Sequence, residues 1–224
     1  MSSGGPAGAK VLKSLTSRSC GRFSKPRRSR GCNGYKNLDK KSMRIIGGER
    51  RKKKLISVPG LDTRPTSDRV KETLFNIIQS RVRGASVLDL FAGTGALGLE
   101  ALSRGALHCT FVDNARGALA VCEKNIEACG YKEKASTLFW NIEKSLARVE
   151  APKDGFHLIF IDPPYRKGLA TKALRHISSQ NFCAREGLVV VEHAAGDPPE
   201  VPDGLRFNET RSYGTTALSF LSWA

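Results

Sequence analysis

The chain has 224 residues, of which 40% are hydrophobic, and its net charge is +16. This length is enough to bury one hydrophobic core and too short for two large domains. No stretch approaches the roughly eighteen consecutive apolar residues of a membrane span, so no membrane-spanning helix is expected. The six cysteines form no Cys-x-x-Cys pair and no cluster with the four histidines, which argues against a metal site and favours buried thiols in a reducing compartment.

The first segment, residues 1–42, is a basic tail. It carries eleven Lys and Arg against one acid, Asp39, for a net charge of +10, and it is rich in Ser and Gly without apolar periodicity. We expect it to be disordered and to act as a transit peptide, because such peptides are Ser- and Arg-rich and poor in acids. The Ser and Thr content favours a chloroplast over a mitochondrion. A nucleic-acid-binding arm is the alternative.

Two small elements are expected before the main sheet. Residues 43–60 contain Gly47-Gly48 between two short runs that are flanked by apolar residues, which predicts a basic β-hairpin appendage. Residues 64–82 begin with Thr66, Ser67 and Asp68 as capping candidates and continue with apolar residues at helical spacing, which predicts a helix.

From residue 85 to 224, strand-like and helix-like stretches alternate. Strands are expected at 86–91, 109–113, 135–140, 156–162 and 187–193, with helices beginning near residues 96, 116 and 169. This alternation predicts βαβ units, and hence an α/β, Rossmann-like core with a mostly parallel sheet between helices. Residues 206–223 read as two strands joined by a short turn, so an antiparallel hairpin should end the sheet.

The first turn of this core has the spacing of a cofactor-binding loop. Gly93, Gly95 and Gly98 follow a strand and precede a helix, and glycine lets the backbone approach a ligand closely. The pattern is shared by nicotinamide, flavin and S-adenosylmethionine sites. Asp89 favours S-adenosylmethionine, because a carboxylate attracts the methionine ammonium and repels a pyrophosphate. Asp113, at the end of the next strand, can accept both ribose hydroxyls.

Later strand ends complete the predicted site. Asn141 and the backbone of Ile142 could meet the adenine edge at the carboxyl ends of the strands. The predicted contacts to the cofactor are Thr66, Asp89, Phe91, Gly93, Gly95, Asp113, Asn141 and Ile142.

The sequence Asp162-Pro163-Pro164-Tyr165 ends an apolar strand and is the predicted catalytic motif. The Asp162 carboxylate and the Pro163 carbonyl can accept hydrogen bonds from a target amine. The prolines remove competing donors and stiffen the backbone. Tyr165 can stack on a base taken out of its helix. The histidines suggest no catalytic base.

These motifs resemble one family. The stretches RIIGG, RPTSDRVKETLFNII, LDLFAGTGALGLEALSRGA, FIDPPY and YGTTALSF are similar to those of the bacterial RsmD-type 16S ribosomal RNA guanine-N2 methyltransferases, from Met43 to Trp223. The resemblance implies a class I, seven-stranded S-adenosylmethionine-dependent methyltransferase that modifies the exocyclic N2 of one guanine in a small-subunit ribosomal RNA or particle. It also implies that Thr66, Asp68 and Arg69 help to close the pocket. This chain departs from the family at two places. Relatives often carry a second acid shortly after the ribose-binding one, where this chain has Ala115, and bacterial members begin near the equivalent of Met43, whereas this chain has the basic tail before it.

The expected partner is therefore ribosomal RNA or a ribosomal particle. Neither a membrane nor a metal ion is expected to take part, and the chain is expected to be a monomer. Phosphate contacts are assigned to Arg50, Arg51, Lys52, Lys53, Lys54, Arg69, Arg166 and Lys167. Three alternatives stay open: an adenine-N6 DNA methyltransferase, a protein-amide methyltransferase, and a non-catalytic ribosome-assembly factor on the same fold.

Overall fold

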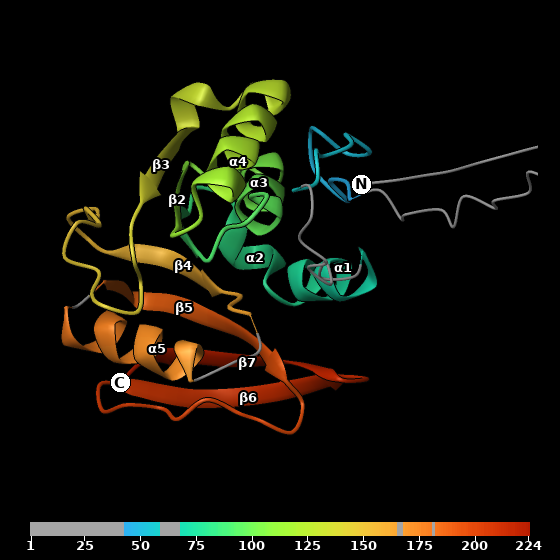
Figure 1. Ribbon diagram of the computed structural model, residues 1–224. Coiled ribbons are helices and arrows are strands. Elements are labelled where there is room, and N and C mark those ends of the chain that lie inside the picture. Colours follow the sequence, from blue (N-terminus) through green and yellow to red (C-terminus); the bar gives the residue numbers. More distant parts are fainter. Residues whose placement is uncertain (1–42, 59–67, 165–167, 181) are drawn as a thin grey trace, which may run out of the picture. The chain divides into compact units, whose positions relative to one another are not determined.

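The computed structural model describes residues 43–58, 68–164, 168–180 and 182–224. Its centre is a seven-stranded sheet in the order β3-β2-β1-β4-β5-β7-β6 (Figure 1). The strands are β1 (Ser86–Leu90), β2 (His108–Asp113), β3 (Ala135–Phe139), β4 (Phe156–Ile161), β5 (Cys183–Ala194), β6 (Leu205–Tyr213) and β7 (Thr216–Trp223). The helices are α1 (Asp68–Ile77), α2 (Gln79–Val82), α3 (Ala96–Ser103), α4 (Arg116–Cys129) and α5 (Leu169–Ser179), with a 3-10 turn, η1, at Lys132–Lys134.

The first five strands of the chain are parallel neighbours, and β7 pairs antiparallel with both β5 and β6. This is the predicted α/β fold, a mostly parallel Rossmann-like sheet ending in an antiparallel hairpin. Parallel strands need crossovers, and the helices that supply them bury both faces of the sheet. The apolar runs of β1 and β4 follow from this, since four of five and five of six of their residues are buried.

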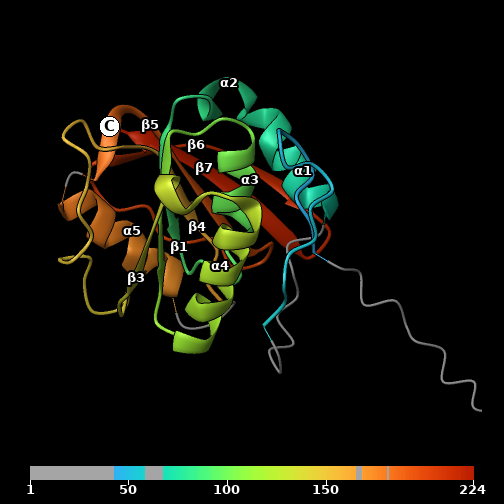
Figure 2. The ribbon, with the colours of Figure 1, turned by 90° about the horizontal axis from the view of Figure 1, so that it is seen from above.

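Helices cover the sheet on two sides (Figures 1 and 2). Helices α1, α3 and α4 pack on one face through a core that includes Phe75, Leu99 and Phe111. Helix α5 packs on the other face, where Leu174 and Ile177 meet alternate residues of the same strands. We call these the α3 face and the α5 face.

Where the sequence predicts a β-hairpin, residues 43–58 fold back on themselves through one isolated antiparallel bridge and contain no strand. Arg44 and Lys54 make an antiparallel bridge, and the backbone N–H of Leu55 donates to Met43 O at 2.9 Å. The turn passes through Gly48 at φ +74° and Lys52 at φ +71°. Since residues 59 and 60 lie outside the described part of the chain, the hairpin is defined here as residues 43–58.

A buried carboxylate holds the hairpin on α3. Glu100 is fully buried, and its two oxygens accept the backbone N–H groups of Ile46 and Gly47, each at 2.7 Å. Arg104 Nε donates to Glu100 Oε1 at 2.8 Å, and Lys71 Nζ lies 3.7 Å from Oε2. Burial lowers the pKa of Lys71, and the Glu100 carboxylate opposes that shift. Four donors therefore converge on one acid.

Asn125 of α4 makes a second connection. Its Oδ1 accepts the N–H of Ile56 at 2.7 Å, and its Nδ2 donates to Ile56 O and to Thr94 O at 3.1 and 3.0 Å. Thr94 lies between the first two glycines of the loop after β1. One side chain thus joins the hairpin to that loop.

The predicted helix at 64–82 differs from the structure in one respect. The helix is divided into α1 and α2 at Ile78, whose φ of −93° and ψ of 11° depart from helical values. Ile78 is buried against the α3 face, so its packing is consistent with the break. Residues 64–67, including the capping candidates Thr66 and Ser67, lie outside the described residues.

Two further sequence-based expectations concern the cysteines and membrane-spanning helices. The four described cysteines, Cys109, Cys122, Cys129 and Cys183, are free and buried, as predicted. Burial raises the pKa of each of these thiols, to about 11 for Cys183, so they stay protonated at neutral pH. In the described part of the chain, no helix is both long and apolar enough to cross a membrane.

We predict that Glu100→Ala lowers the free energy of unfolding by about 3–5 kcal/mol, because it leaves the Lys71 ammonium buried without its acid and two backbone N–H groups without their acceptor. Urea unfolding measures the change. The matched control is Glu127→Ala, which removes an exposed pair with Lys132 and should change stability little. Equal losses in the two variants would contradict the assigned role of Glu100.

Candidate active site

The loop after β1 has an unusual backbone. Phe91 has φ +62°, a left-handed conformation that is strained for a side chain of this size, and Gly93 and Gly95 follow at φ +56° and +79°. A Cβ built on Gly93 would meet only one atom within 4 Å, Phe91 O at 3.9 Å. Glycine is therefore needed for the backbone conformation there, and the space beside Gly93 is open to a ligand.

The other two glycines are needed for close packing. A Cβ on Gly95 would lie 2.7 Å from Cys122 Sγ, and one on Gly98 would lie 2.3 Å from the Phe111 ring. The G-x-G-x-x-G spacing therefore combines an open loop with a helix seated tightly on β2, as dinucleotide and S-adenosylmethionine sites both require.

The predicted ribose acid, Asp113, supports the loop. Its Oδ2 accepts the N–H of Gly93 at 2.8 Å and its Oδ1 accepts that of Ala115 at 2.8 Å. A carboxylate has about four lone-pair sites, so each oxygen retains capacity for a hydroxyl donor. The geometry thus fits the predicted role and shows a second one, which is to fix the loop.

Asp89 is more deeply buried than a simple ligand contact requires. It is 2% exposed, and its Oδ2 accepts the N–H of Gly98 at 2.9 Å in the first turn of α3. Burial raises the pKa of Asp89 to about 7; the hydrogen bond from Gly98 opposes this shift and nearby Asp113 adds to it. The carboxyl group therefore changes charge near neutral pH, so its attraction for a bound cation should depend on pH.

A hollow of about 490 Å³ lies where the adenine edge was predicted. Asn141 contributes to it, together with Asn114, which directly follows Asp113. Asn141 Oδ1 also accepts the N–H of Glu143 at 2.9 Å, while Ile142 is buried. The remaining lining residues are Phe139, Trp140, Lys144 and Arg148.

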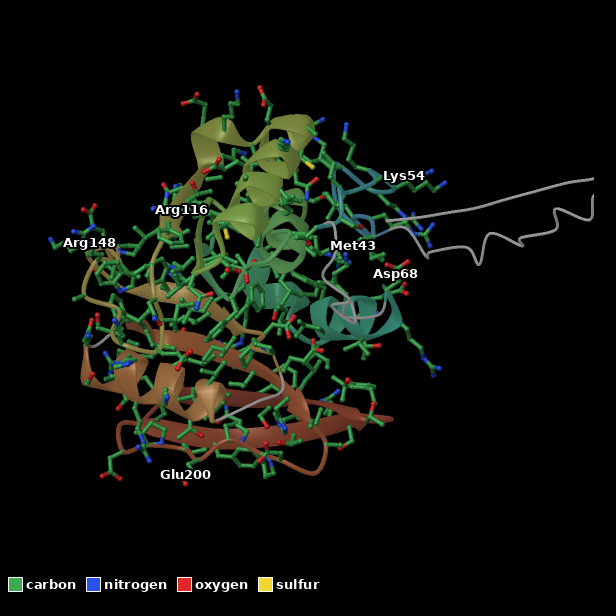
Figure 3. All side chains as sticks on the ribbon, viewed as in Figure 1. Met43, Lys54, Asp68, Arg116, Arg148 and Glu200 are labelled. Atoms are coloured by element: carbon green, nitrogen blue, oxygen red, sulfur yellow. The ribbon has the colours of Figure 1, made fainter. Side chains whose placement is uncertain are left out.

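Sequence reasoning missed the aromatic and cationic part of this hollow. The guanidinium carbon of Arg148 lies 4.9 Å from the Trp140 ring centroid, and that of Arg116 lies 4.3 Å from the Phe139 ring. Figure 3 labels both arginines. The aromatic pair Phe139-Trp140 at the end of β3 was the available signal, but such a pair is equally typical of a buried core.

The predicted catalytic motif begins where β4 ends. The N–H of Asp162 continues the strand pairing by donating to Leu90 O at 3.4 Å. Asp162 is half-buried, Pro163 is buried and Pro164 is exposed. The remaining predicted residues of this region, Tyr165, Arg166 and Lys167, and also Thr66, lie outside the described residues.

Strand register places the three predicted acids together. Asp89 pairs with Phe111 on one side and with Phe160 on the other. Paired residues share a face of the sheet, as do residues two apart along a strand, so Asp113 and Asp162 share the α3 face with Asp89. All three acids therefore stand at the carboxyl edge of adjacent parallel strands, as the sequence predicted.

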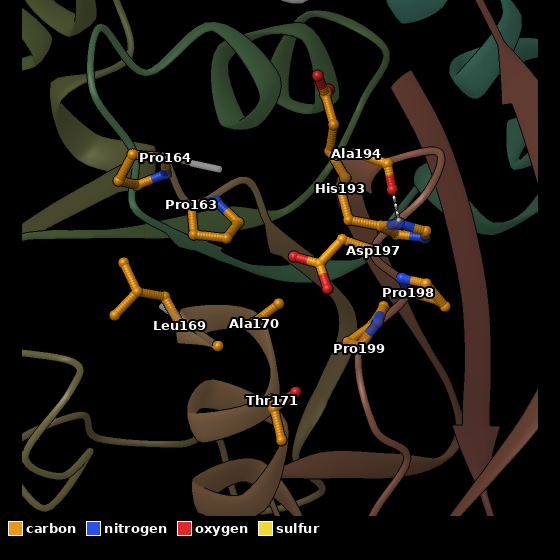
Figure 4. Close-up of a pocket in the computed structure, with 12 residues that line it drawn as sticks. Pro163, Pro164, Leu169, Ala170, Thr171, His193, Ala194, Asp197, Pro198 and Pro199 are labelled. Carbon is orange, nitrogen blue, oxygen red and sulfur yellow. Dashed lines mark hydrogen bonds between the residues drawn. The ribbon is translucent and has the colours of Figure 1, made fainter. Parts of the chain in front are cut away.

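A second hollow, of about 50 Å³, adjoins the catalytic motif (Figure 4). Pro163 and Pro164 form one side, the start of α5 forms another, and the end of β5 with the following loop supplies Glu192, His193 and Asp197. Sequence reasoning left Glu192 and Asp197 out. Both ring nitrogens of His193 have partners, Ala194 O and Ser219 Oγ at 2.8 Å each, which agrees with the absence of a predicted histidine base.

The predicted RNA contacts on the hairpin are all exposed. Figure 3 shows Lys54 extending away from the sheet. Arg50 is partly engaged within the protein, since its Nε donates to Cys129 O at 2.8 Å and its guanidinium lies 5.7 Å from the Tyr131 ring centroid. Arg69 is exposed on α1. The hairpin therefore presents Arg51, Lys52, Lys53 and Lys54 to solvent.

The fold is that of the class I, S-adenosylmethionine-dependent methyltransferases, a mostly parallel seven-stranded sheet with helices on both faces. A solved Escherichia coli structure, named "Putative methyltransferase yhhF", is similar with a TM-score of 0.72 and 35% identity, over 81% of this chain and 98% of that one.

The family follows from the sequence comparisons. Residues 43–222 match the family described as Conserved hypothetical protein 95. Ribosomal RNA small subunit methyltransferase D of Escherichia coli strain K12 is 36% identical over 176 residues, 78% of this chain and 87% of that protein. Its counterpart in Haemophilus influenzae is 30% identical over 78% of this chain and 91% of that protein. The chain belongs to this family, the RsmD-type methyltransferases that its motifs resemble.

Proposed function

We propose that this rRNA methyltransferase transfers a methyl group from S-adenosylmethionine to the exocyclic N2 of one guanine in a 16S-type small-subunit ribosomal RNA. One observation carries the proposal. The glycine-rich loop follows β1, and the Asp162-Pro163-Pro164 motif follows the adjacent strand β4. Asp89 and Asp162 share one face of the sheet near its carboxyl edge. A donor held by the loop and an amine held by the motif would then meet.

The residues after β1, β2 and β3 fit S-adenosylmethionine. The open backbone at Gly93 leaves room for a ligand, the Asp113 carboxylate has acceptor capacity for ribose hydroxyls, and the hollow at Asn141 has the amide and aromatic groups that hold a purine. Asp89, when ionised, attracts the methionine ammonium. When bound, S-adenosylmethionine supplies an electrophilic methyl group on a sulfonium.

Asp162 and Pro163 orient the acceptor. The Asp162 carboxylate and the Pro163 carbonyl accept hydrogen bonds from the amine, so that the nitrogen lone pair faces the methyl carbon for direct in-line displacement. Pro163 is buried, and Pro164 after it restricts ψ of Pro163, so the Pro163 carbonyl is positioned before the base arrives. Stacking of the base on Tyr165 stays a prediction.

The hairpin would hold the ribosomal RNA backbone. Its exposed cations neutralise phosphates, a contact that carries no sequence information and weakens as salt rises. The tethers through Glu100 and Asn125 attach it firmly to α3 and α4. Phosphates bound there would be held in a defined position relative to the loop.

We predict that the purified protein transfers labelled methyl to small-subunit particles from an Escherichia coli strain lacking its own methyltransferase D, and that Asp162→Ala lowers the rate by about 10²–10³-fold, because an acceptor set before the reaction is lost. Mass spectrometry of the digested RNA locates the methyl group on guanine N2. S-Adenosylmethionine binding should be unchanged in the variant.

Asp154→Ala, which removes an exposed acid before β4, is the matched control and should keep full activity. Label on naked DNA, or on protein rather than RNA, would favour the other methyltransferase classes. Cofactor binding without transfer to any of these substrates would favour an assembly factor.

A pH dependence follows from Asp89. Its raised pKa, about 7, means that lowering the pH from 7 to 5 protonates the group, which then no longer attracts an ammonium. We predict that S-adenosylmethionine affinity, measured by calorimetry, falls by up to about tenfold per pH unit over that range. It should fall again above about pH 8, where the α-amino group of the ligand loses its proton. Asp89→Asn should bind weakly and show no dependence between pH 5 and 7; the same slope in this variant would assign the titration to another group.

The basic tail, residues 1–42, supports a proposal about location, because its composition is that of a transit peptide. We predict that residues 1–42 fused to a fluorescent protein direct it to chloroplasts in plant cells, with mitochondria as the alternative destination. A fusion that stays in the cytosol, or accumulates on nucleic acid, would contradict import.

A further inference from the structure

Three exposed cations near the end of β3 take no part in the proposed reaction. Arg116 begins α4 shortly after β2, and Lys144 and Arg148 follow β3. We call these three residues the β3-edge cluster. Among the residues that the structure describes, none of the three forms a salt bridge with a carboxylate. An anionic ligand would therefore complement the cluster.

The acids around the cluster do not neutralise it. Glu143 pairs with Lys172 of α5, with 3.4 Å between Oε2 and Nζ. Glu150, two residues beyond Arg148, is exposed and forms no salt bridge with it in the described part of the chain. The arginines contact aromatic rings instead.

Each arginine is held against one ring. The guanidinium carbon of Arg116 lies 4.3 Å from the centroid of Phe139, and that of Arg148 lies 4.9 Å from the centroid of Trp140. The Trp140 ring is fixed in turn, because its Nε1 donates to Ser145 O at 2.9 Å. A guanidinium that covers a ring keeps N–H groups at its own edge, where two of them can bind one phosphate. Both arginines are thus oriented before a ligand arrives, which lowers the entropic cost of binding.

The two stacked pairs lie on different faces of the sheet. Phe139 pairs in register with Asp113, which is on the α3 face, whereas Trp140 packs with the core of the α5 face. Arg116 and Arg148 therefore stand on either side of the edge strand. A small anion with one phosphate cannot reach both, but a nucleic-acid backbone that crosses the edge can.

The cluster lies at the edge of the sheet that bears the catalytic motif. Asp113 and Phe139 end β2 and β3, and Asp162 follows the end of β4. The strand order β3-β2-β1-β4 separates β3 from β4 by three spacings of about 4.8 Å, or roughly 14 Å in all. This distance corresponds to a few nucleotides of RNA.

The hairpin reaches the same edge from another direction. Its residue Ile56 is joined through the Asn125 side chain to Thr94, in the loop after β1. Figure 3 shows Lys54 of the hairpin and the two arginines of the cluster on opposite sides of the described core. A polyanion bound at both surfaces would pass along the carboxyl edge between them, where the catalytic motif lies.

We propose that the β3-edge cluster is a second contact surface for the ribosomal RNA backbone. Arg116 and Arg148 bind different phosphates on one side of the target base, while the hairpin binds phosphates on the other side. This inference rests on the proposed activity toward ribosomal RNA. It leaves the hollow at Asn141 to the adenine of the cofactor and assigns only the charged rim to RNA.

The test removes both charges in the double variant Arg116→Gln/Arg148→Gln. We expect its affinity for small-subunit particles, measured by filter binding, to fall roughly 10–100-fold. The slope of log affinity against log salt concentration should become shallower by about 1.4–1.8, because each lost phosphate contact removes about 0.7–0.9. KM for the particles should rise with kcat unchanged, since these contacts hold the RNA and touch no reacting atom.

The matched control is Arg83→Gln/Arg185→Gln. It removes the same charge from two exposed arginines near the amino ends of β1 and β5, at the other edge of the sheet. Its affinity and salt slope should stay close to those of the wild type. Arg116→Lys/Arg148→Lys keeps the charge but loses the planar fork and the stacking, so it should restore the salt slope and only part of the affinity.

Three results would overturn the proposal. They are unchanged particle binding in the Arg116→Gln/Arg148→Gln variant, an equal loss in the control variant, and a loss of S-adenosylmethionine affinity by calorimetry with particle affinity intact. The last result would assign the arginines to the cofactor pocket. If thermal unfolding shows that the double variant does not fold, the two single variants replace it, and each should give about half of the change in slope.

Failure of the proposed function gives a different result. In that case the wild-type protein places no methyl on guanine N2. Failure of this inference leaves that transfer intact, and the Arg116→Gln/Arg148→Gln variant then binds particles as the wild type does.

Discussion

Parallel pairing of β2, β1, β4 and β5 is the constraint on which the site depends. Because these strands run in the same direction, their carboxyl ends lie at one edge, and because their register is fixed, residues far apart in the sequence share a face there. Asp89, Asp113, Asp162 and Glu192 come from four strands and line up in this way. A slip of one residue in any pairing would turn the affected acid toward the α5 face.

Placing several acids on one face has an electrostatic cost that the fold manages locally. Asp113 receives two backbone N–H groups and Asp89 receives one, and the pKa of Asp89 is nevertheless raised to about 7, mainly by burial and to a smaller extent by the charge of Asp113. Cationic or donor-bearing ligands relieve this repulsion more than neutral ones. Methionine ammonium, ribose hydroxyls and a guanine edge are ligands of that kind, so the electrostatics of the edge agree with the proposed reactants.

Much of this arrangement was accessible from the sequence. Alternating elements predicted the sheet, and acids at strand ends predicted the site, because parallel strand ends must meet at one edge. The position of Glu192 beside Asp162 could not be predicted, because an acid ending an apolar run does not reveal its neighbour until the strand order is known. The Glu100 tether was also missed, since helical periodicity alone does not show that a polar position in α3 faces the hairpin. The Ile78 break depends on tertiary packing, which local pattern does not encode.

Asn125 bonds both to the hairpin backbone at Ile56 and to the carbonyl of Thr94 in the glycine-rich loop. A shift of that carbonyl must either stretch the amide contact or move the hairpin with it. The loop and the hairpin are therefore coupled, and the Thr94 hydroxyl, which donates to Met43 Sδ at 3.0 Å, adds a second connection between them.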